Sequence, residues 1–523
     1  MDAGIIKKNG HFSRISRSCL LLIVLAWFNT ALAANGTVNW PEFDNVSYID
    51  PQNFYLHGKV RFTECLVNDP SNTHFRRLDC GMVSVPVDYK EPKGKQIQLF
   101  VGRIKAAGKK PRPDPLIPLA GGPGAAASES YLFPNQGFDK INLQRDIFII
   151  DQRGTGKSQK LSCPGLMEAN SELSELSSSK YRELISKCLK VLPPYVDQFT
   201  TSLAVKDLQY IRKALAVDSW NIYGASYGTR VAQHYLRQYP QNTRTVILDA
   251  VVHPQAFLAY DIALMSEKAL KLMYQRCKQS AVCDKQFPDL EHAVEILFTR
   301  LKKQSVELQM ESFNSGEHAA MRVGPDELKL MIRMHLYSSD ATAILPLLLY
   351  QAYKENYAPL ARNSQKLLNT FGDLIALGMH NSVVCSEDIA FMDKAKFDRA
   401  ALENTYMGPQ VFDLMFDACE LWPSGPVDAN LRESVASDRP VLLLSGTADP
   451  ITPPDYAEKA ALKLSNSKHI VAQGLAHGLA RYGCMPTLMA KFIEEASLAN
   501  IQGECINKTG PEPFFMDFNG PSP

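Results

Sequence analysis

The sequence lacks an excess of charge of either sign. Its 523 residues include 56 Lys and Arg against 55 Asp and Glu, for a net charge of +1. Nucleic acids and anionic membranes are usually bound by strongly basic surfaces, so we expect neither as a partner. Internal repeats and low-complexity segments are missing too, while 45% of the residues are hydrophobic and 21% are charged. This composition is typical of a soluble globular protein with a sizeable core.

The common sequence signs of a metal site are also missing. No Cys-x-x-Cys pair and no His-Glu-x-x-His motif occurs, and the 11 histidines are scattered along the chain. Zinc sites in proteins use closely spaced Cys and His ligands. The sequence therefore predicts no metal site, and nothing in it requires an organic cofactor.

The apolar run near the N-terminus, Cys19 to Phe28, is shorter than the ~20 residues that span a bilayer. Basic residues precede it, and Ala31-Leu32-Ala33 follows with the small side chains that signal peptidase accepts. We interpret residues 1–33 as a secretory signal peptide, with an uncleaved membrane anchor as the alternative. The mature protein would then be secreted or periplasmic, without stable membrane insertion after signal removal.

The 11 cysteines are too many for a typical cytosolic enzyme and too dilute for a small disulfide scaffold. One of them, Cys19, lies in the predicted signal, which leaves an even number. Sequence alone does not choose among the possible pairings of ten cysteines, and free buried thiols are the alternative to pairing. We predict that neighbours in sequence pair: Cys65 with Cys80, Cys163 with Cys188, Cys277 with Cys283, Cys385 with Cys419, and Cys484 with Cys505.

Short apolar runs rich in β-branched residues alternate with helical periodicity along much of the chain. The predicted strands are Ile97–Val101, Leu116–Ala120, Asp146–Ile150, Trp220–Tyr223, Thr245–Leu248, Pro440–Leu444 and His469–Ala472. Such runs, separated by helices, are typical of a parallel sheet covered on both faces, and so of an α/β fold.

One stretch of the chain lacks this alternation of short apolar runs and helical segments. From Val252 to about Arg439 long amphipathic segments prevail, among them Asp289–Lys303, Pro325–Leu336 and Ala341–Tyr353. We therefore predict a first core segment at 34–251, a mainly helical lid at 252–439 inserted between two strands, and a second core segment at 440–523.

The strongest chemical signal is the motif Gly224-Ala225-Ser226-Tyr227-Gly228. A predicted strand runs directly into it, and Val231 to Arg237 continues as a helix. Glycines two residues before and after the serine allow a tight turn that exposes the hydroxyl above the sheet. A surface turn would not need this strand and helix, so the pattern predicts Ser226 as a nucleophile.

A serine nucleophile needs a base and an acid that orients the base, and in this type of fold the acid precedes the histidine. Asp449 stands just after the strand Pro440–Leu444, and His477 stands in a glycine-flanked loop after the following strand. We predict these two as the partners of Ser226. Asp249 is the alternative acid, with packing or turn capping as its other role, and His469 is the alternative base.

Acyl transfer also requires donors for the oxyanion of the tetrahedral intermediate. The glycine-rich segment Leu119 to Gly124 follows a predicted strand, and Pro123 within it has no N–H to donate. We assign the oxyanion hole to the main-chain amides of Gly122 and Tyr227, the residue after the nucleophile. A plain glycine-rich turn is the alternative.

A Gly-Lys-Ser sequence within Asp151 to Ser158 suggests a phosphate-binding loop at first sight. The complete motif requires glycine five residues before Gly156, where this chain has Asp151. We therefore do not expect a nucleotide site. The segment is better interpreted as a turn in which Asp151 and Arg153 brace the floor of the active site.

In this order, the segments 121–124, 151–158 and 224–228 resemble those of the prolyl and tripeptidyl aminopeptidase branch of the α/β-hydrolase serine peptidases. The resemblance continues through Asp449 and His477 and covers most of the mature chain. It departs at Ala120, where the smaller prolyl members usually have histidine. The length and the predicted secretion favour the larger secreted relatives, and the resemblance implies an exopeptidase that acts on peptides with a free N-terminus.

Such an enzyme needs a carboxylate at a fixed distance from the nucleophile to bind the substrate's ammonium group. The segment 382–388 is similar to one in the larger family members, and it implies Glu387, with Asp388 second, as this anchor. A solvated or helix-capping acidic pair is the alternative. Two other functions stay open: a carboxylesterase or lipase with the same triad, and a non-catalytic binding protein on the same fold.

Overall fold

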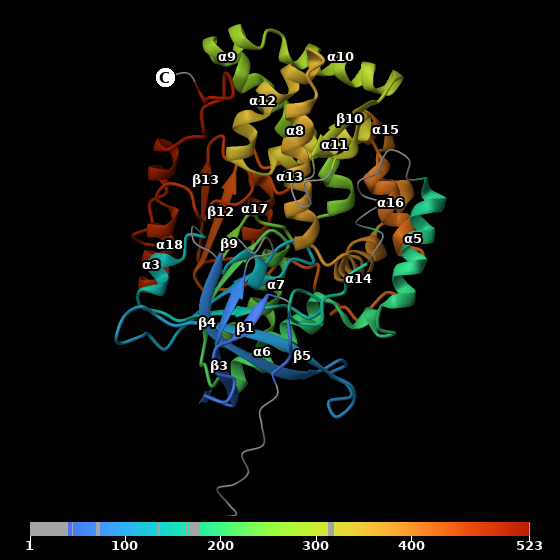
Figure 1. Cartoon of the computed structure of the whole chain (residues 1–523). Helices are drawn as coiled ribbons and strands as arrows, with labels where there is room; N and C mark the ends of the chain where they lie inside the picture. Colours follow the sequence, from blue (N-terminus) through green and yellow to red (C-terminus); the bar gives the residue numbers. More distant parts are fainter. Residues whose placement is uncertain are drawn as a thin grey trace, which may run out of the picture.

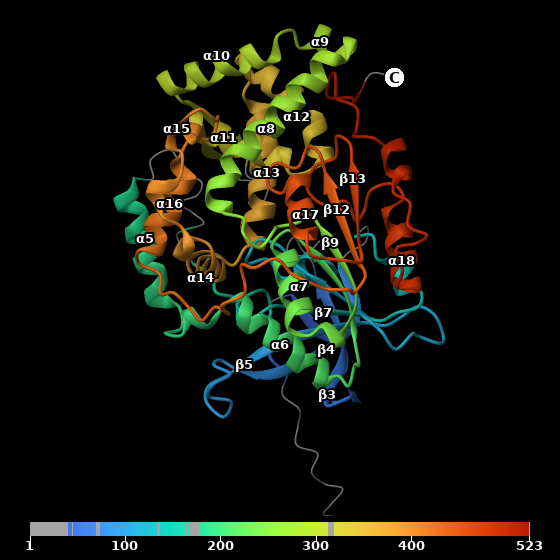
Figure 2. The same ribbon diagram turned by 180° about the vertical axis from the view of Figure 1, so that it is seen from behind.

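The structure is a computed structural model that describes residues 40–43, 45–68, 74–132, 136–163, 166, 177–311 and 318–521. The predicted signal peptide, residues 1–33, lies outside the described residues. Figures 1 and 2 show the arrangement from two opposite sides, with the large sheet running from the centre downward and a mainly helical region at the top.

A large twisted sheet forms the centre of the protein. Its strands are β1 (Val46–Tyr48), β2 (Phe54–His57), β3 (Val60–Asn68), β4 (Phe75–Pro86), β5 (Gln96–Ile104), β6 (Leu116–Leu119), β7 (Ile147–Ile150), β8 (Trp220–Ala225), β9 (Thr243–Asp249), β12 (Val441–Gly446) and β13 (Ser467–Ala472). The order is β1-β3-β4-β5-β7-β6-β8-β9-β12-β13, and β2 pairs with β3. From β7 to β13 neighbouring strands are parallel, as the apolar runs predict.

The prediction of parallel pairing is wrong for one strand. Strand β5, which contains the predicted run Ile97–Val101, is antiparallel to both neighbours, β4 and β7. Parallel neighbours need a crossover connection, usually through a helix, and only a short turn joins β4 to β5. The antiparallel strands β1 to β4 have no counterpart among the predicted strands.

Helices cover both faces of the sheet. On one face α6 (Thr201–Ala214), α7 (Tyr227–Gln238) and α17 (Pro454–Ala461) bury apolar side chains against the strands. On the other face lie α2 (Ala127–Ser130), α3 (Asp139–Asn142) and α18 (Met485–Glu495), with α3 packed on α18. This is the two-sided cover expected of an α/β fold.

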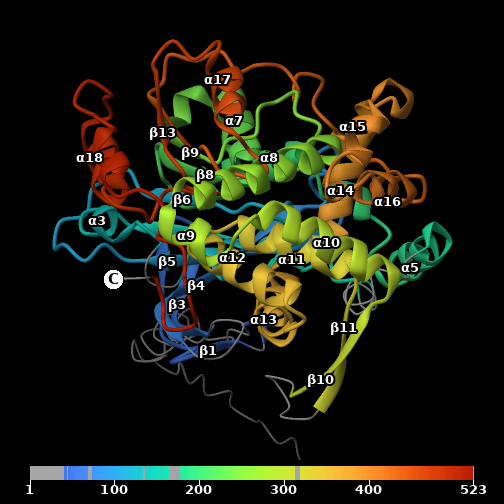
Figure 3. The same cartoon turned by 90° about the horizontal axis from the view of Figure 1, so that it is seen from above.

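The chain between β9 and β12 is mainly helical and lies over the end of the sheet where the parallel strands terminate (Figures 1 and 3). Its helices are α8 (Leu258–Gln279), α9 (Ala281–Gln286), α10 (Leu290–Lys303), α11 (Pro325–Leu336), α12 (Ser339–Tyr353), α13 (Ala358–Leu374), α14 (Leu377–Glu387), α15 (Arg399–Glu403) and α16 (Gln410–Cys419). We call this segment the lid. It also contains a hairpin of β10 (Val306–Glu311) and β11 (His318–Val323), which the sequence pattern does not predict.

One helix from the earlier part of the chain belongs in space with the lid. Helix α5 (Ser178–Val191) precedes α6 in sequence, yet it packs on α16 and shares an apolar cluster with α14 and α16. The helical region above the sheet therefore consists of the lid together with α5.

The disulfide pairing follows the prediction at every described cysteine: Cys65–Cys80, Cys163–Cys188, Cys277–Cys283, Cys385–Cys419 and Cys484–Cys505. Cys385–Cys419 joins the end of α14 to the end of α16 inside the lid. Within the described residues, no helix combines the length and the apolar character needed to cross a membrane.

Candidate active site

Ser226 lies in a strained turn between β8 and α7. Its backbone has φ 55° and ψ −126°, a combination that few residues other than glycine adopt. The flanking glycines make the turn possible: a Cβ on Gly224 would lie 2.4 Å from the Gly228 oxygen, and a Cβ on Gly228 would lie 2.2 Å from the Leu119 oxygen. The motif thus forms the sharp strand-to-helix turn that its spacing predicts.

Asp449 and His477 lie close together at the carboxyl ends of the neighbouring parallel strands β12 and β13. The Nδ1 atom of His477 lies 2.9 Å from Oδ2 of Asp449. Thr452, which sequence reasoning missed, donates its hydroxyl and its amide to the same carboxylate at 2.8 and 2.9 Å. It stands only three residues after Asp449, so its position in the acid's turn was the available signal. Asp449 is buried, whereas His477 and Ser226 are half-buried.

The electrostatics of this pair favour a charged imidazole. Burial acts to lower the pKa of His477, but the charge and the hydrogen bond of Asp449 outweigh it, so that the pKa of His477 is raised above its ordinary value of 6.5. An acid that fixes one imidazole nitrogen leaves the other free to exchange a proton.

The two alternative residues have other contacts. Asp249 is fully buried, and its carboxylate accepts hydrogen bonds from the amides of Leu479 and Ala480 and from the Tyr223 hydroxyl. It therefore holds the chain just after His477 rather than contacting the imidazole in a hydrogen bond. His469 lies within β13, where its Nε2 is 3.0 Å from the Ser445 hydroxyl.

The glycine-rich loop that contains Gly122 is held by the lid. The carbonyl of Gly124 accepts a hydrogen bond from the amide of Ala376 at 2.9 Å, just before α14 begins. One turn into α14, Nδ1 of His380 lies 3.2 Å from the Pro123 oxygen. The start of α14 therefore fixes the loop to which we assign one oxyanion donor.

Tyr227, the other predicted donor, begins α7, where main-chain amides have no partner inside the helix. Its side chain points away into the core, and its hydroxyl lies 2.7 Å from Thr201 Oγ1 and 3.0 Å from Gln152 Nε2. Burial raises the pKa of this phenol, which stays protonated.

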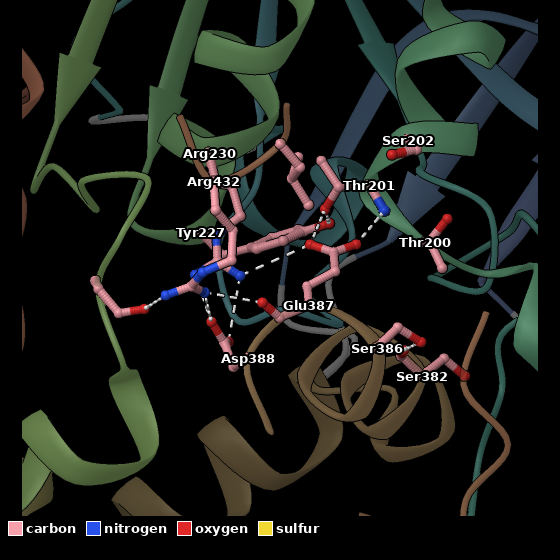
Figure 4. Close-up of polar contacts among 12 residues, drawn as sticks. Thr200, Thr201, Ser202, Tyr227, Arg230, Ser382, Ser386, Glu387, Asp388 and Arg432 are labelled. Carbon is pink, nitrogen blue, oxygen red and sulfur yellow. Dashed lines mark hydrogen bonds and ion pairs between the residues drawn. The ribbon is translucent and has the colours of Figure 1, made fainter. Parts of the chain in front are cut away.

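Glu387, at the end of α14, lies near the hydroxyl of this tyrosine, and the Thr201 hydroxyl contacts both side chains (Figure 4). Its carboxylate accepts hydrogen bonds from the amide of Thr201 at 2.6 Å and from the Thr201 hydroxyl at 2.7 Å. Burial raises the pKa of Glu387 to about 7, although the positive charge of Arg230, 3.7 Å away, acts in the opposite direction. The side chain is completely shielded from solvent.

Asp388 points toward two arginines in the same view, and one of them, Arg230, also lies near Glu387 (Figure 4). Arg230 donates to both oxygens of Asp388, at 2.8 and 3.2 Å, and Arg432 lies 3.3 Å from one of them. The cluster of Arg230, Arg432, Glu387 and Asp388 therefore contains as many positive as negative side chains. The two predicted anchor acids lie close together, but both are buried and already hydrogen-bonded.

The polar side chains of the loop from Asp151 to Ser158 make internal contacts. Asp151 accepts hydrogen bonds from Ser128 and from the amide of Lys157, and the lysine ammonium donates to the Ser128 hydroxyl at 3.1 Å. Arg153, completely buried, forms a two-point ion pair with Asp207 at 2.6 and 2.7 Å. The Gly-Lys-Ser sequence is thus used for internal contacts.

The lid adds a residue that no sequence pattern pointed to. The ring of Tyr337, just after α11, lies 5.3 Å from the imidazole of His477, and its carbonyl accepts a hydrogen bond from the His477 amide at 3.2 Å. Because 140 residues separate the two in sequence, only the fold brings them together.

Several characterised proteins are similar to part of this chain. A tripeptidyl aminopeptidase of Streptomyces lividans is 33% identical over 211 residues, which cover 36% of this chain and 39% of the relative. Serine protease Hip1 of Mycobacterium bovis is 29% identical over 215 residues, 38% of this chain and 41% of the relative. A proline iminopeptidase of Neisseria meningitidis is 26% identical over 137 residues, which cover 26% of this chain and 32% of the relative. The chain thus spans about two fifths of the length of the first two relatives.

One solved structure and one protein-family model match a larger part of the chain. Among solved structures, the proline iminopeptidase of Mycobacterium smegmatis aligns with 80% of this chain and 99% of its own, at 15% identity and a TM-score of 0.37. Residues 114–479 match the model of the alpha/beta hydrolase fold. That match covers more than half of the sequence and includes the strained serine turn, the acid and the histidine, so the chain belongs to the α/β-hydrolase fold family.

Proposed function

We propose that this protein is a secreted or periplasmic serine exopeptidase that releases an amino acid, dipeptide or tripeptide from the free N-terminus of peptides. The observation that supports it most directly is the Asp449–His477 hydrogen bond at the sheet edge where the strained Ser226 lies. The peptidase names of the similar proteins favour amide over ester substrates. The disulfides favour an oxidising compartment.

In the proposed mechanism His477 removes the proton of Ser226, which attacks the scissile carbonyl. The amides of Gly122 and Tyr227 bind the oxyanion, and each such donor contributes ~3–4 kcal/mol to transition-state stabilisation. His477 then protonates the leaving amine and later activates the water that hydrolyses the acyl-enzyme, while Asp449 holds the imidazole in one tautomer. The scheme uses only groups of the protein itself.

A fluorophosphonate probe tests the nucleophile. We expect the folded wild-type protein to be labelled, the label to map to Ser226, and Ser226→Ala to remain unlabelled. Ser445→Ala, a change of another serine near the same sheet, should still be labelled. If the folded wild-type protein is not labelled, the proposed mechanism is wrong.

Peptide bonds and esters are distinguished by a substrate panel. Free and N-acetylated peptidyl amides of one to three residues would be compared with simple acyl esters. An exopeptidase hydrolyses the free-amine peptides best, and the preferred length identifies the released fragment. Hydrolysis of esters without turnover of any peptide would instead identify a carboxylesterase.

Glu387 is the acid we propose for the substrate's ammonium group, because Asp388 is already neutralised by two arginines. Binding requires the buried Glu387 carboxylate to become accessible to the substrate. If Glu387 is the anchor, Glu387→Gln raises KM for free-amine peptides and leaves KM for their N-acetylated counterparts unchanged. If Glu387 only supports Tyr227 through Thr201, kcat falls for both kinds of substrate and the anchor prediction is wrong.

A further inference from the structure

Arg333 lies on α11 of the lid, close to the proposed catalytic base. Its Nη2 atom donates to the hydroxyl of Tyr337 at 3.2 Å. The ring of Tyr337 in turn lies 5.3 Å from the imidazole of His477. A single aromatic side chain therefore separates the guanidinium from the base.

Arg333 is also within electrostatic reach of the glycine-rich loop. The pKa of His380 is lowered, mainly by burial and to a smaller extent by the positive charge of Arg333. His380 is the residue whose Nδ1 contacts the Pro123 oxygen. The guanidinium thus contacts Tyr337, which lies beside His477, and its charge acts on His380, which contacts the glycine-rich loop.

The charge of Arg333 has no counter-ion among the described residues. None of the ion pairs there includes it, and its Nε atom is buried without a hydrogen-bond partner. The other arginines around the site behave differently: Arg230 is bound by Asp388, and Arg153 is bound by Asp207. A buried guanidinium N–H without an acceptor is unfavourable, because it has lost water and gained nothing in exchange.

This arrangement is explained if the acceptor arrives with the substrate. We propose that Arg333 binds a carboxylate of the substrate, so that the lid selects anionic peptides. The planar guanidinium can present two parallel N–H groups to one carboxylate, a geometry that gives both affinity and orientation. The carboxylate is either the C-terminus of a short peptide or the side chain of an Asp or Glu residue. The inference rests on the proposed function for its peptide substrates.

Matched substrate pairs test this role. One pair is a peptide with a free C-terminal carboxylate and the same peptide as its C-terminal amide, and the second is a Glu peptide and its Gln counterpart. For each pair, the ratio is kcat/KM of the anionic peptide divided by kcat/KM of the neutral peptide. In one pair we expect this ratio to be about 10- to 100-fold lower in Arg333→Gln than in wild type. The pair that responds identifies the source of the carboxylate. Equal ratios in wild type and variant for both pairs would overturn the proposal.

The variants distinguish binding from general damage. Arg333→Lys keeps the charge but not the two-point geometry, so its ratio should fall less than that of Arg333→Gln. Tyr337→Phe keeps the ring beside His477 and removes the hydroxyl that accepts from Arg333, which should lower the ratio modestly. Lys329→Gln removes a positive charge from the same helix, where it is paired with Asp326, and should leave the ratio as in wild type.

An ester pair keeps this test independent of the exopeptidase proposal. The 4-nitrophenyl esters of glutaric acid and of its monomethyl ester share one reactive group and differ in one carboxylate. If no peptide is hydrolysed, the exopeptidase proposal fails, yet a ratio for this pair that falls in Arg333→Gln would still support carboxylate binding. If peptides are hydrolysed and no ratio changes in any pair, the role of Arg333 fails and the proposed function stands.

Discussion

The carboxylate of Asp249 accepts hydrogen bonds from the amide of Leu479, at 2.8 and 2.9 Å from its two oxygens, two residues after His477. The main-chain oxygen of the same aspartate accepts a hydrogen bond from the amide of Ser226 at 3.0 Å. One buried residue at the end of β9 thus connects the turn of Ser226, the proposed nucleophile, with the loop of His477, the proposed base. The relative position of Ser226 and His477 depends on it.

Asp249→Asn should therefore lower kcat without removing any triad residue. An amide presents one oxygen to the Leu479 and Ala480 amides, and its NH₂ group would face a second donor. We expect kcat to fall roughly 10- to 100-fold, the scale of a small misplacement of a catalytic group. Steady-state kinetics would measure it, with Asp455→Asn on the exposed start of α17 as the control. Unchanged kcat in a folded Asp249→Asn protein would contradict this role.

The pH profile should report the raised pKa of His477. The general base must be neutral, so kcat/KM should increase with pH through a pKa above 6.5. Asp449→Asn removes the charge that raises this pKa. The rise of kcat/KM with pH should therefore occur at lower pH in this variant, while kcat falls about 10⁴-fold. Residual activity on an activated ester allows the profile of the variant to be measured. If kcat/KM rises at the same pH in wild type and variant, His477 is not the titrating group.

Glu387 should make stability depend on pH. Burial raises its pKa to about 7 from an ordinary 4.5, so the folded state binds the proton more tightly than the unfolded state. Its favourable contribution is full below pH 4.5 and is lost as the pH rises toward 7. Glu387→Gln removes this titration, so its Tm relative to wild type should be higher at pH 8 than at pH 5. Thermal unfolding at both pH values gives the answer, and a Tm difference independent of pH would argue against the raised pKa.

The serine turn should not tolerate a side chain at its second glycine. A Cβ on Gly228 would lie 2.2 Å from the oxygen of Leu119, so Gly228→Ala should reduce the free energy of unfolding by about 3 kcal/mol or more. Gly408→Ala is the comparison without a collision: its φ is +66°, whereas Gly228 lies in helix α7, and no atom lies within 4 Å of the added carbon. Strain alone should cost about 1–2 kcal/mol there. Urea unfolding compares the two, and a loss at Gly228 no larger than that at Gly408 would show that the turn accommodates the added carbon.

The disulfides should contribute unequally. Cys385–Cys419 closes a loop of 34 residues, whereas Cys277–Cys283 closes a loop of six. Chain entropy gives about 4 kcal/mol for the longer loop and about 2 kcal/mol for the shorter one. Replacing each pair by serine and measuring unfolding in urea should reproduce this order. Equal effects would mean that strain or residual structure outweighs loop length.

Much of the fold could be predicted because its signals are local. A parallel strand buried on both faces must be apolar along its length, so β6, β7, β8 and β12 are visible as short runs. The antiparallel strands β1 to β4 and the lid hairpin were missed, since strands with one exposed face alternate apolar and polar residues and resemble loops. The direction of β5 depends on its neighbours, which no local run encodes.

For the site, the sequence by itself determined the parts with short-range geometry. The tight turn at Ser226 requires glycine at fixed spacing because a Cβ would collide with main-chain atoms there. The expected order of acid and histidine predicted Asp449 and His477, and the fold brings these two within hydrogen-bond distance. Contacts between distant segments were decided only by the tertiary structure. In the folded chain the carboxylate of Glu387 is buried and accepts a hydrogen bond from Thr201. The lid places Tyr337 beside His477, and Arg333 donates a hydrogen bond to Tyr337. Burial and counter-ions are properties of the packed chain, because they depend on which distant side chains exclude water from a charge.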